Sequence, residues 1–252
     1  MVVAVILITS MSYAQSDSGV DNQAETESRT VLITGANRGI GLELARQYSA
    51  DGWQVIGTAR KPDEAVELSG LPNVLILQLD VTDQESVARL AEIVGDQPID
   101  VLINNAGVLQ MVGSVADIDP DDFSYTLAVN TLGPVRVTQA VLSNLRRGEL
   151  KKIINITSNL GSITDNTSGQ FYGYRESKAA LNMFTRSLAA ELRPEGFTCV
   201  VLHPGWVKTD MGGPDAPVTV QESARGIREV IDGLTATDSG TYWTHRGEQL
   251  AW

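Results

Sequence analysis

Short apolar runs alternate along most of this chain with segments of helical periodicity. The runs are rich in valine, isoleucine and leucine and are interpreted as strands buried on both faces. They lie at residues 30–34, 53–58, 74–79, 99–103, 152–157 and 197–202, with 240–244 as a candidate seventh. Between them, apolar positions recur every three to four residues, as in amphipathic helices. These helices are expected at residues 40–50, 86–94, 121–145, 172–193 and 220–232.

This order of elements predicts the fold class. Strands that alternate with helices form βαβ units, and such units build a parallel sheet covered by helices. The predicted class is therefore α/β, a doubly wound, Rossmann-type parallel sheet of about seven strands. A length of 252 residues suits one large domain of this kind. The catalytic domain is expected to span residues 29–252.

The first 28 residues differ from the rest of the chain. Residues 2–8 form an apolar run too short to span a bilayer, and small side chains at Ser12 and Ala14 fit signal-peptidase cleavage after Ala14. However, no lysine or arginine precedes Arg29, and residues 15–28 are polar like a disordered linker. An export signal, an upstream start-site artefact and a loose tail remain open. An exported or periplasmic location thus stays open beside a cytoplasmic one.

Charge and cysteine content exclude some functions. A net charge of −12 argues against nucleic-acid binding, which requires a basic face. The only cysteine, Cys199, cannot form an intrachain disulfide, and its apolar neighbours favour a small buried side chain over a nucleophile. No metal site is predicted.

A tyrosine and a lysine give the first indication of chemistry. Tyr174 and Lys178 are four residues apart, so they lie on one face of a predicted helix. An ammonium there favours the phenolate and is expected to lower the pKa of Tyr174 below its usual ~10. Tyr172 competes for this role, but it is followed at the same spacing by Glu176, which would raise a phenol pKa. The pair suits acid–base catalysis on a carbonyl, although an exposed helix face also carries such spacings.

A glycine-rich turn links the first strand to the first helix. Glycines there allow a tight turn, close approach of the backbone to a pyrophosphate, and a helix N-terminus that faces negative charge. A glycine turn without a ligand is the alternative. The expected contacts are Gly35, Asn37, Arg38, Gly39, Ile40 and Gly41.

The end of the second strand indicates which dinucleotide is bound. NAD sites usually place an acidic residue there, whereas this chain has Ala59 followed by Arg60. Arg60 and Arg38 suit the 2′-phosphate of NADP through charge-assisted hydrogen bonds. NADP(H) is therefore expected, and nearby Asp63 and Glu64 keep NAD(H) possible.

Several motifs occur in one order along the chain. They are the glycine turn, Asn104-Asn105-Ala106-Gly107, Ser158, Tyr174-x-x-x-Lys178 and Pro204-Gly205. In this combination the chain resembles the short-chain dehydrogenase/reductase family over residues 29–252. Within the family it is most similar to the group of sniffer-type carbonyl reductases and C-factor signalling proteins. That similarity rests on residues 57–62, 172–182, 203–213 and Trp252.

The resemblance implies a role for each matching residue. Ser158 would hydrogen-bond the substrate carbonyl, and Tyr174 would donate the proton. Lys178 would lower the pKa of Tyr174 and bind the nicotinamide ribose, while Asn130 would hold a water that connects Lys178 to solvent. The other implied cofactor contacts are Asp80 and Val81 around adenine, Asn104, Ala106 and Gly107 on the adenosine side, Pro204, Gly205 and Val207 on the nicotinamide, and Thr209 near its amide or the phosphates.

The implied reaction is hydride transfer from NADPH to the carbonyl of a small aldehyde, ketone or quinone, or its reverse. More residues separate Ser158 from Tyr174 than is usual in the family, and the excess lies in the loop 161–171, which is expected to border the substrate. The alternative is a C-factor-like signalling or interaction protein that binds a nicotinamide cofactor on the same fold. A homodimer is expected by family analogy.

Overall fold

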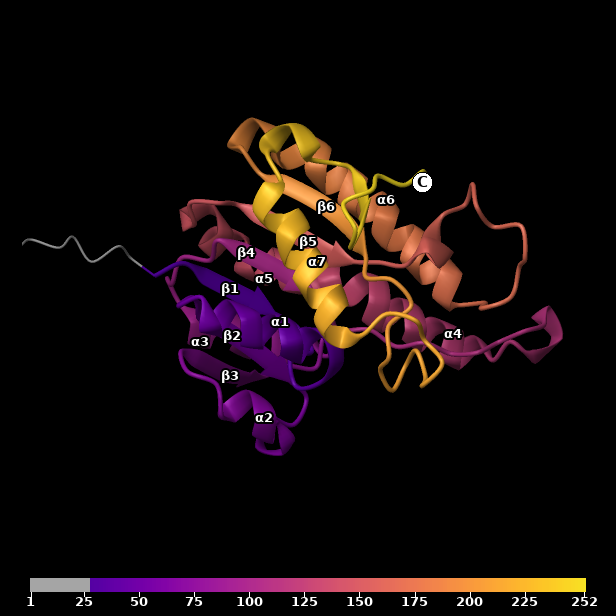
Figure 1. Cartoon of the computed structure of the whole chain (residues 1–252), viewed down its shortest axis with the longest axis horizontal. Helices are drawn as coiled ribbons and strands as arrows, with labels where there is room; N and C mark the ends of the chain where they lie inside the picture. Colours follow the sequence, from indigo (N-terminus) through magenta and orange to yellow (C-terminus); the bar gives the residue numbers. More distant parts are fainter. Residues whose placement is uncertain (1–27) are drawn as a thin grey trace, which may run out of the picture.

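Figure 1 shows a computed structural model of the chain, which describes residues 28–252 as one parallel sheet between two layers of helices. The strand order is β3-β2-β1-β4-β5-β6-β7. The direction of the order reverses between β1 and β4, as in Rossmann folds, so the predicted fold class is confirmed. The strands are β1 (Thr30–Ile33), β2 (Gln54–Ala59), β3 (Val74–Gln78), β4 (Val101–Asn104), β5 (Lys152–Ile156), β6 (Thr198–His203) and β7 (Tyr242–Thr244).

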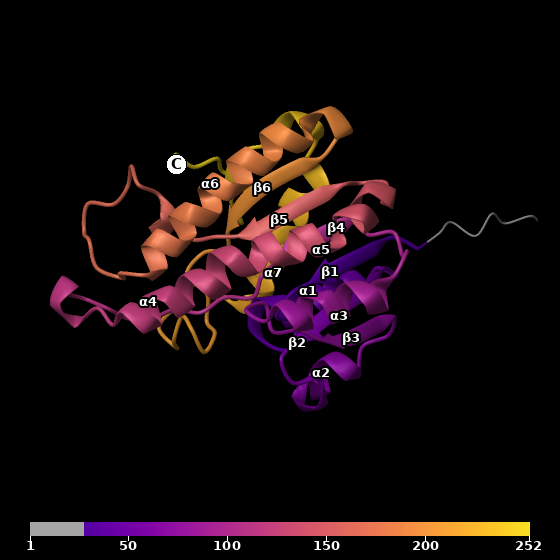
Figure 2. The same ribbon diagram turned by 180° about the vertical axis from the view of Figure 1, so that it is seen from behind.

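The helices divide between the two faces of the sheet. Those on the face toward the viewer in Figure 1 are α1 (Gly39–Ala50) and α7 (Val220–Gly233). Those on the face toward the viewer in Figure 2 are α3 (Gln84–Val94), α5 (Gly133–Arg147) and α6 (Tyr174–Leu192). The shorter helices α2 (Val66–Ser69) and α4 (Pro120–Leu127) lie at the edge and at the end of the sheet.

Burial of both faces explains the continuous apolar runs in the strands. Val31 and Ile33 of β1 pack in the cluster that includes α1 and α7, while Leu32 between them packs with α3 and α5 on the other face. All three side chains have no exposed surface. Each buried aliphatic side chain of this size contributes roughly 1.5–3 kcal/mol.

The helix expected over 121–145 is not uniform. Between α4 and α5, residues Ala128–Leu132 form a π-helical turn. Pro134 is one cause, because it has no N–H to donate to the carbonyl of Asn130 four residues earlier. The wider turn carries Asn130, and π-helical turns often occur at functional sites. The four-residue helix α2 was too short to leave a periodic pattern.

The predictions of a signal-like or disordered N-terminus concern residues outside the described part, which begins at Ser28. Within residues 28–252, no helix combines the length and apolar character needed to cross a bilayer. The same residues contain no cluster of three or more metal-ligating side chains. Cys199 is buried on β6, and burial raises the pKa of its thiol to about 12, as expected for an inert core residue.

Candidate active site

A cavity of about 820 Å³ opens at the carboxyl ends of the parallel strands. Open α/β sheets bind ligands at this edge, next to the point where the strand order reverses. The volume falls in the range of small-molecule and cofactor sites. Its wall consists largely of segments at the ends of successive strands: residues 35 and 37–40, 58–61, 79–81, 105–108, 156–157 and 204.

The glycine turn forms one side of the cavity. Gly35 and Gly39 have φ angles of 65° and 55°, which favour glycine, and both line the cavity. A Cβ on Gly35 would lie 3.1 Å from Cα of Ala106. Gly41 lies behind the turn, away from the wall, and a Cβ there would collide with the Gly35 carbonyl oxygen. Its role is therefore close packing of α1 against the turn.

Asn104 ends β4 and Asn105 follows it, and their side chains lie in different places. Asn104 does not line the cavity: its Nδ2 donates to Oδ1 of Asn155 at 2.8 Å and to Thr138 beneath the wall. Successive side chains of an extended segment point in opposite directions, so the next residue, Asn105, reaches the cavity instead. The backbone N–H groups of Asn105 and Ala106 both donate to Oγ1 of Thr34 at 3.0 Å, which joins the ends of β1 and β4.

Basic side chains gather where β2 ends. Arg38 and Arg60 line the cavity beside Ala59, the position at which an NAD site would carry an acid. Arg38 forms an ion pair of 2.9 Å with Asp210, from the segment after β6, and both side chains are largely exposed. Glu64 also lines the cavity but is paired with Lys61 at 2.8 Å. No pattern in the sequence indicates the Arg38–Asp210 pair, because a contact between residues so distant in the chain depends on the fold.

Asp80 and Val81, which follow β3, both line the cavity. The backbone N–H and the hydroxyl of Thr82 donate to Oδ1 of Asp80 at 2.9 and 2.6 Å. Burial opposes ionisation of Asp80, but these hydrogen bonds and the nearby Arg60 charge together lower the pKa of its carboxyl. Asp80 is therefore a carboxylate held in a fixed orientation.

Tyr174 and Lys178 lie at the start of α6, and both line the cavity. Lys178 Nζ donates to the carbonyl of Ile156 at 2.9 Å and lies 5.7 Å from the centroid of the Tyr174 ring.

Ser158, two residues after β5, is nearly buried beside Tyr174. Its Oγ accepts the N–H of Leu160 at 3.2 Å and makes only a long contact of 3.4 Å with Asn159. The Ser158 hydroxyl lies against Tyr174, and Ser158 itself is not among the residues that line the cavity.

Burial dominates the electrostatics of this pair. It raises the pKa of the Tyr174 phenol above its ordinary value, an effect that the neighbouring Ser158 hydroxyl partly offsets. It also lowers the pKa of Lys178 to about 8. The expectation of a Tyr174 pKa below ~10 thus differs from the structure, because the helical spacing predicted the contact between the two residues but not how deeply they are buried.

Asn130 supports this side of the cavity from below. Its Oδ1 accepts the N–H of Val108 at 2.9 Å, and its Nδ2 donates to the Val108 carbonyl at 2.9 Å and to Ser177 Oγ at 3.0 Å. The side-chain amide is thus fully engaged in the fold. A Cβ on Gly107 would lie 3.3 Å from Asn130 Oδ1 and 3.8 Å from Lys178 Nζ, so Gly107 leaves room above both side chains.

Of the residues expected at the nicotinamide, Pro204 and Thr209 line the cavity, while Gly205 and Val207 lie behind it. Gly205 has a φ of 90°, and a Cβ there would lie 2.8 Å from Cε1 of His245. Val207 is buried where it forms a β-bridge with Val218. Both residues therefore shape this segment next to the cavity wall.

Arg175 organises the loop 161–171, a role that no motif in the sequence indicates. Its guanidinium donates to the carbonyls of Gly169, Gln170 and Leu160 at 3.0 to 3.3 Å and to Ser168 Oγ at 3.1 Å. The side chain is nearly buried although charged. Arg175 directly follows Tyr174, so the start of α6 and this loop are fixed together.

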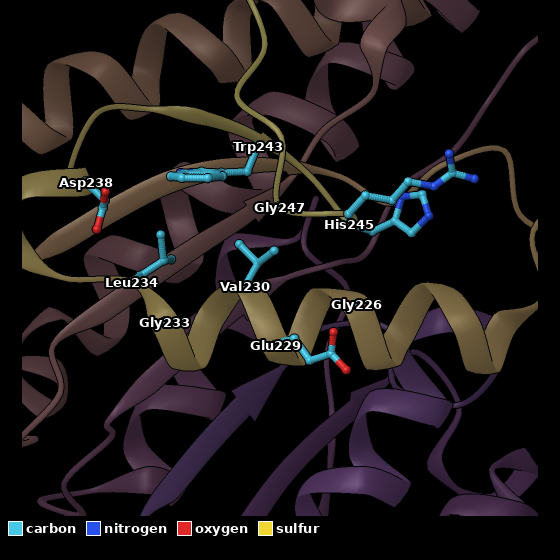
Figure 3. Close-up of a pocket in the computed structure, with 10 residues that line it drawn as sticks. Gly226, Glu229, Val230, Gly233, Leu234, Asp238, Trp243, His245 and Gly247 are labelled. Atoms are coloured by element: carbon cyan, nitrogen blue, oxygen red, sulfur yellow. The ribbon is translucent and has the colours of Figure 1, made fainter.

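A second hollow, of about 290 Å³, lies between α7 and the turn after β7. Figure 3 shows the residues that line it. It shares no lining residue with the larger cavity and contains neither Tyr174 nor Lys178. Its wall is formed by Gly226, Glu229, Val230, Gly233, Leu234, Asp238, Trp243, His245, Arg246 and Gly247. The larger cavity is therefore the candidate active site.

The sheet order, the glycine turn and the cavity at the strand ends define a Rossmann-type dinucleotide-binding domain. A family model described as short chain dehydrogenase matches residues 29–217. The chain belongs to this family, and the resemblance inferred from the motifs is confirmed.

Individual relatives agree with this family. The crystal structure of NADPH bound carbonyl reductase from chicken fatty liver is 39% identical, with a TM-score of 0.82, over 89% of this chain and 99% of that one. The carbonyl reductase Sniffer of Drosophila melanogaster is 34% identical with the same TM-score, over 89% of this chain and all of that one. C-signal of Myxococcus xanthus is 51% identical over 155 residues, which cover 62% of this chain and 93% of that protein.

Proposed function

We propose that this protein is an NADP-dependent carbonyl reductase, which reduces the carbonyl of a small aldehyde, ketone or quinone and catalyses the reverse alcohol oxidation. The observation that carries the proposal is the buried Tyr174–Lys178 pair on the cavity wall, with Ser158 beside Tyr174. Similarity to carbonyl reductases over 89% of the chain supports it. The proposed catalytic unit is residues 29–252.

The cavity fits NADP(H) at both of its ends. The backbone of the glycine turn and the N-terminus of α1 would hold the pyrophosphate, and Arg38 and Arg60 would hold the 2′-phosphate. Asp80 and Val81 would bracket the adenine, and Lys178 would bind the nicotinamide ribose. The bound cofactor supplies the hydride, while the protein supplies position, charge and the proton.

The side chains divide the proton chemistry between them. Hydroxyl donors from Ser158 and Tyr174 would stabilise the developing oxyanion, each worth ~3 kcal/mol. The raised pKa keeps Tyr174 protonated before the reaction, so it has a proton to give to the alkoxide. The ammonium of Lys178 then stabilises the phenolate that remains. Such general acid catalysis adds ~10²–10⁴-fold to a rate.

After the reaction, Tyr174 must regain the proton that it donated. We propose that this proton arrives through the region below Lys178. The side-chain amide of Asn130 is engaged by Val108 and Ser177, so its main-chain carbonyl is the group proposed to hold the connecting water. Pro134 cannot donate to that carbonyl, since it has no N–H.

Tyr174→Phe tests the proposal most directly. This variant is expected to lose at least ~10²-fold in NADPH-dependent carbonyl reduction, because the proton donor is gone. Binding of NADPH, followed by cofactor fluorescence, is expected to remain. Tyr172→Phe is the matched control and should keep full activity, since Tyr172 does not line the cavity. Turnover retained in Tyr174→Phe would refute the mechanism.

A signalling or interaction protein on the same fold is the second candidate. The identity of 51% to C-signal favours it. Addition of NADPH to the full chain, followed by a panel of aldehydes, ketones and quinones, distinguishes the two. Turnover supports the reductase, whereas a chain that binds NADPH but reduces none of these carbonyls supports the second candidate.

We also propose a homodimer, by analogy with family members that pair through the helices carrying the Asn and Tyr–Lys motifs. Two apolar side chains on or beside those helices are exposed. They are Leu132, next to α5, at 46%, and Met183, on α6, at 67%. Light scattering is expected to give twice the chain mass, and Met183→Lys to reduce it. A monomer at micromolar concentration would refute the proposal.

A further inference from the structure

Tyr242 connects the last strand of the sheet to the candidate active site. It lies on β7, is 1% exposed, and its hydroxyl donates to the carbonyl oxygen of Ser158 at 2.5 Å. The two residues are 84 positions apart in the chain. Buried tyrosine hydroxyls usually find a partner, but here the partner is the backbone of the residue expected to hold the substrate.

We propose that Tyr242 is a positioning residue, which fixes the peptide of Ser158 so that the Ser158 hydroxyl faces the substrate oxygen, and that Trp252 holds Tyr242 in place. This inference rests on the proposed carbonyl reduction. It adds to that reaction a requirement for Tyr242, which none of the family motifs contains.

The segment around Ser158 depends on such support, because β5 ends at Ile156 and Ser158 has left the sheet. Gly161 N–H also donates to the Ser158 carbonyl, at 2.8 Å. On either side, Asn182 accepts from the Thr157 hydroxyl at 2.7 Å and donates to the Gly161 carbonyl at 3.2 Å. Without the Tyr242 hydroxyl, the Ser158 carbonyl keeps one donor. The segment is therefore expected to loosen rather than unfold.

Trp252 packs on the other side of Tyr242. The two ring centroids are 5.5 Å apart, and the guanidinium of Arg186 lies 5.3 Å from the Trp252 ring. Arg186 in turn donates to the Gly240 carbonyl at 2.9 Å, just before β7. A main-chain oxygen of Trp252 accepts the N–H of Thr164 at 3.2 Å, in the loop 161–171. Trp252 therefore contacts both Tyr242 and the loop expected to border the substrate.

Tyr242 acts through geometry and not through its proton. Burial, reinforced by the nearby Tyr174 and Asp165, raises the pKa of its phenol above the ordinary value, so the hydroxyl stays a donor over the whole range in which activity is measured. A positioning role therefore predicts a lower rate with an unchanged shape of the pH–rate profile.

The test is steady-state kinetics with NADPH on the full-length chain and on Tyr242→Phe, which removes only the hydroxyl. We expect kcat to fall about tenfold, the Kd for NADPH to stay within twofold, and the pH profile to keep its shape.

Tyr48→Phe is the matched control, because Tyr48 is equally buried, has a hydroxyl without a partner in the described residues, and packs on the far face of the sheet. It should leave kcat unchanged. Trp252→Leu should lower kcat and raise KM for the carbonyl substrate.

The outcomes separate this inference from the proposed function. A wild-type chain without carbonyl reduction refutes the proposed function and the inference together. An active wild type with unchanged kcat in Tyr242→Phe overturns only the inference. So does a variant that loses kcat, NADPH affinity and thermal stability in parallel, because that indicates a purely structural role. If Tyr242→Phe does not fold, unchanged kinetics in Trp252→Leu overturn the inference.

Discussion

At the scale of single residues, burial and charge act against each other on the Tyr174–Lys178 pair. The ammonium would stabilise a phenolate, but the pair is buried, and burial disfavours both charged forms. The pKa of Tyr174 is therefore raised and that of Lys178 lowered to about 8. The neutral phenol of Tyr174 can donate a proton. The Lys178 ammonium beside it deprotonates readily, which suits a donor that must regain its proton after each reaction.

The lowered pKa of Lys178 predicts a pH limit for carbonyl reduction. The ammonium is present below about pH 8 and is lost above it, so kcat/KM is expected to fall about tenfold per pH unit beyond that point. A pH–rate profile from 6 to 10 measures this, with roughly constant activity below the break. Lys178→Arg is the control, since a guanidinium stays charged over the whole range and its residual activity should show no such fall. A wild-type profile flat to about pH 10 would contradict the role of Lys178.

Cofactor choice is also decided by single residues. Arg60→Ala is expected to weaken NADPH binding ~10–100-fold and to leave NADH nearly unaffected, because a charge-assisted hydrogen bond contributes ~1.5–3 kcal/mol. Fluorescence titration with both cofactors measures the ratio. Arg89→Ala, an exposed arginine on α3 outside the cavity wall, should change neither affinity. Equal losses for NADPH and NADH in Arg60→Ala would argue against a 2′-phosphate contact.

At the scale of elements, turns and helix ends place the chemistry. The π-helical turn between α4 and α5 carries Asn130, and the short segment after β5 carries Ser158. Helix α1 comes close enough to the glycine turn only because Gly41 has no side chain. The contacts that matter are therefore made where regular structure ends.

Gly41→Ala tests the packing of α1. Its Cβ would collide with the Gly35 carbonyl, so overpacking is expected to cost ~1–3 kcal/mol of unfolding free energy and to weaken cofactor binding. Denaturant unfolding and NADPH titration measure the two effects. Gly233→Ala, also in a helix but with open space around its Cβ position, is the control. It should be neutral or stabilising by less than ~1 kcal/mol. A Gly41→Ala variant as stable as Gly233→Ala would refute the close contact.

At the scale of the whole molecule, the cavity joins the carboxyl ends of most strands of the sheet. Residues from the ends of β1 to β6 line one continuous wall. A ligand in this cavity contacts segments that are far apart in the chain, and none of those contacts exists together in the unfolded state. Cofactor binding and global stability should therefore be linked.

This linkage predicts a thermal shift. NADPH at 100 times its Kd is expected to add ~2.7 kcal/mol to the free energy of unfolding, which corresponds to about 5–10 °C in Tm for a chain of this size. NADH at the same concentration should give a smaller shift, and Arg60→Ala should reduce the shift by NADPH. Absence of any shift at saturating NADPH would contradict binding in the cavity.

The sequence by itself determined the class of fold and the residues of the Tyr174–Lys178 motif, because alternating periodicities and short spacings are local properties of the chain. It also separated Tyr174 from Tyr172 by their neighbours at four residues. Only the tertiary structure decided the rest. It placed Asn105 and not Asn104 on the wall, reversed the expected pKa direction at Tyr174, and brought Tyr242 to Ser158. Depth of burial and contacts between distant segments are properties of the packed molecule, which no short spacing encodes.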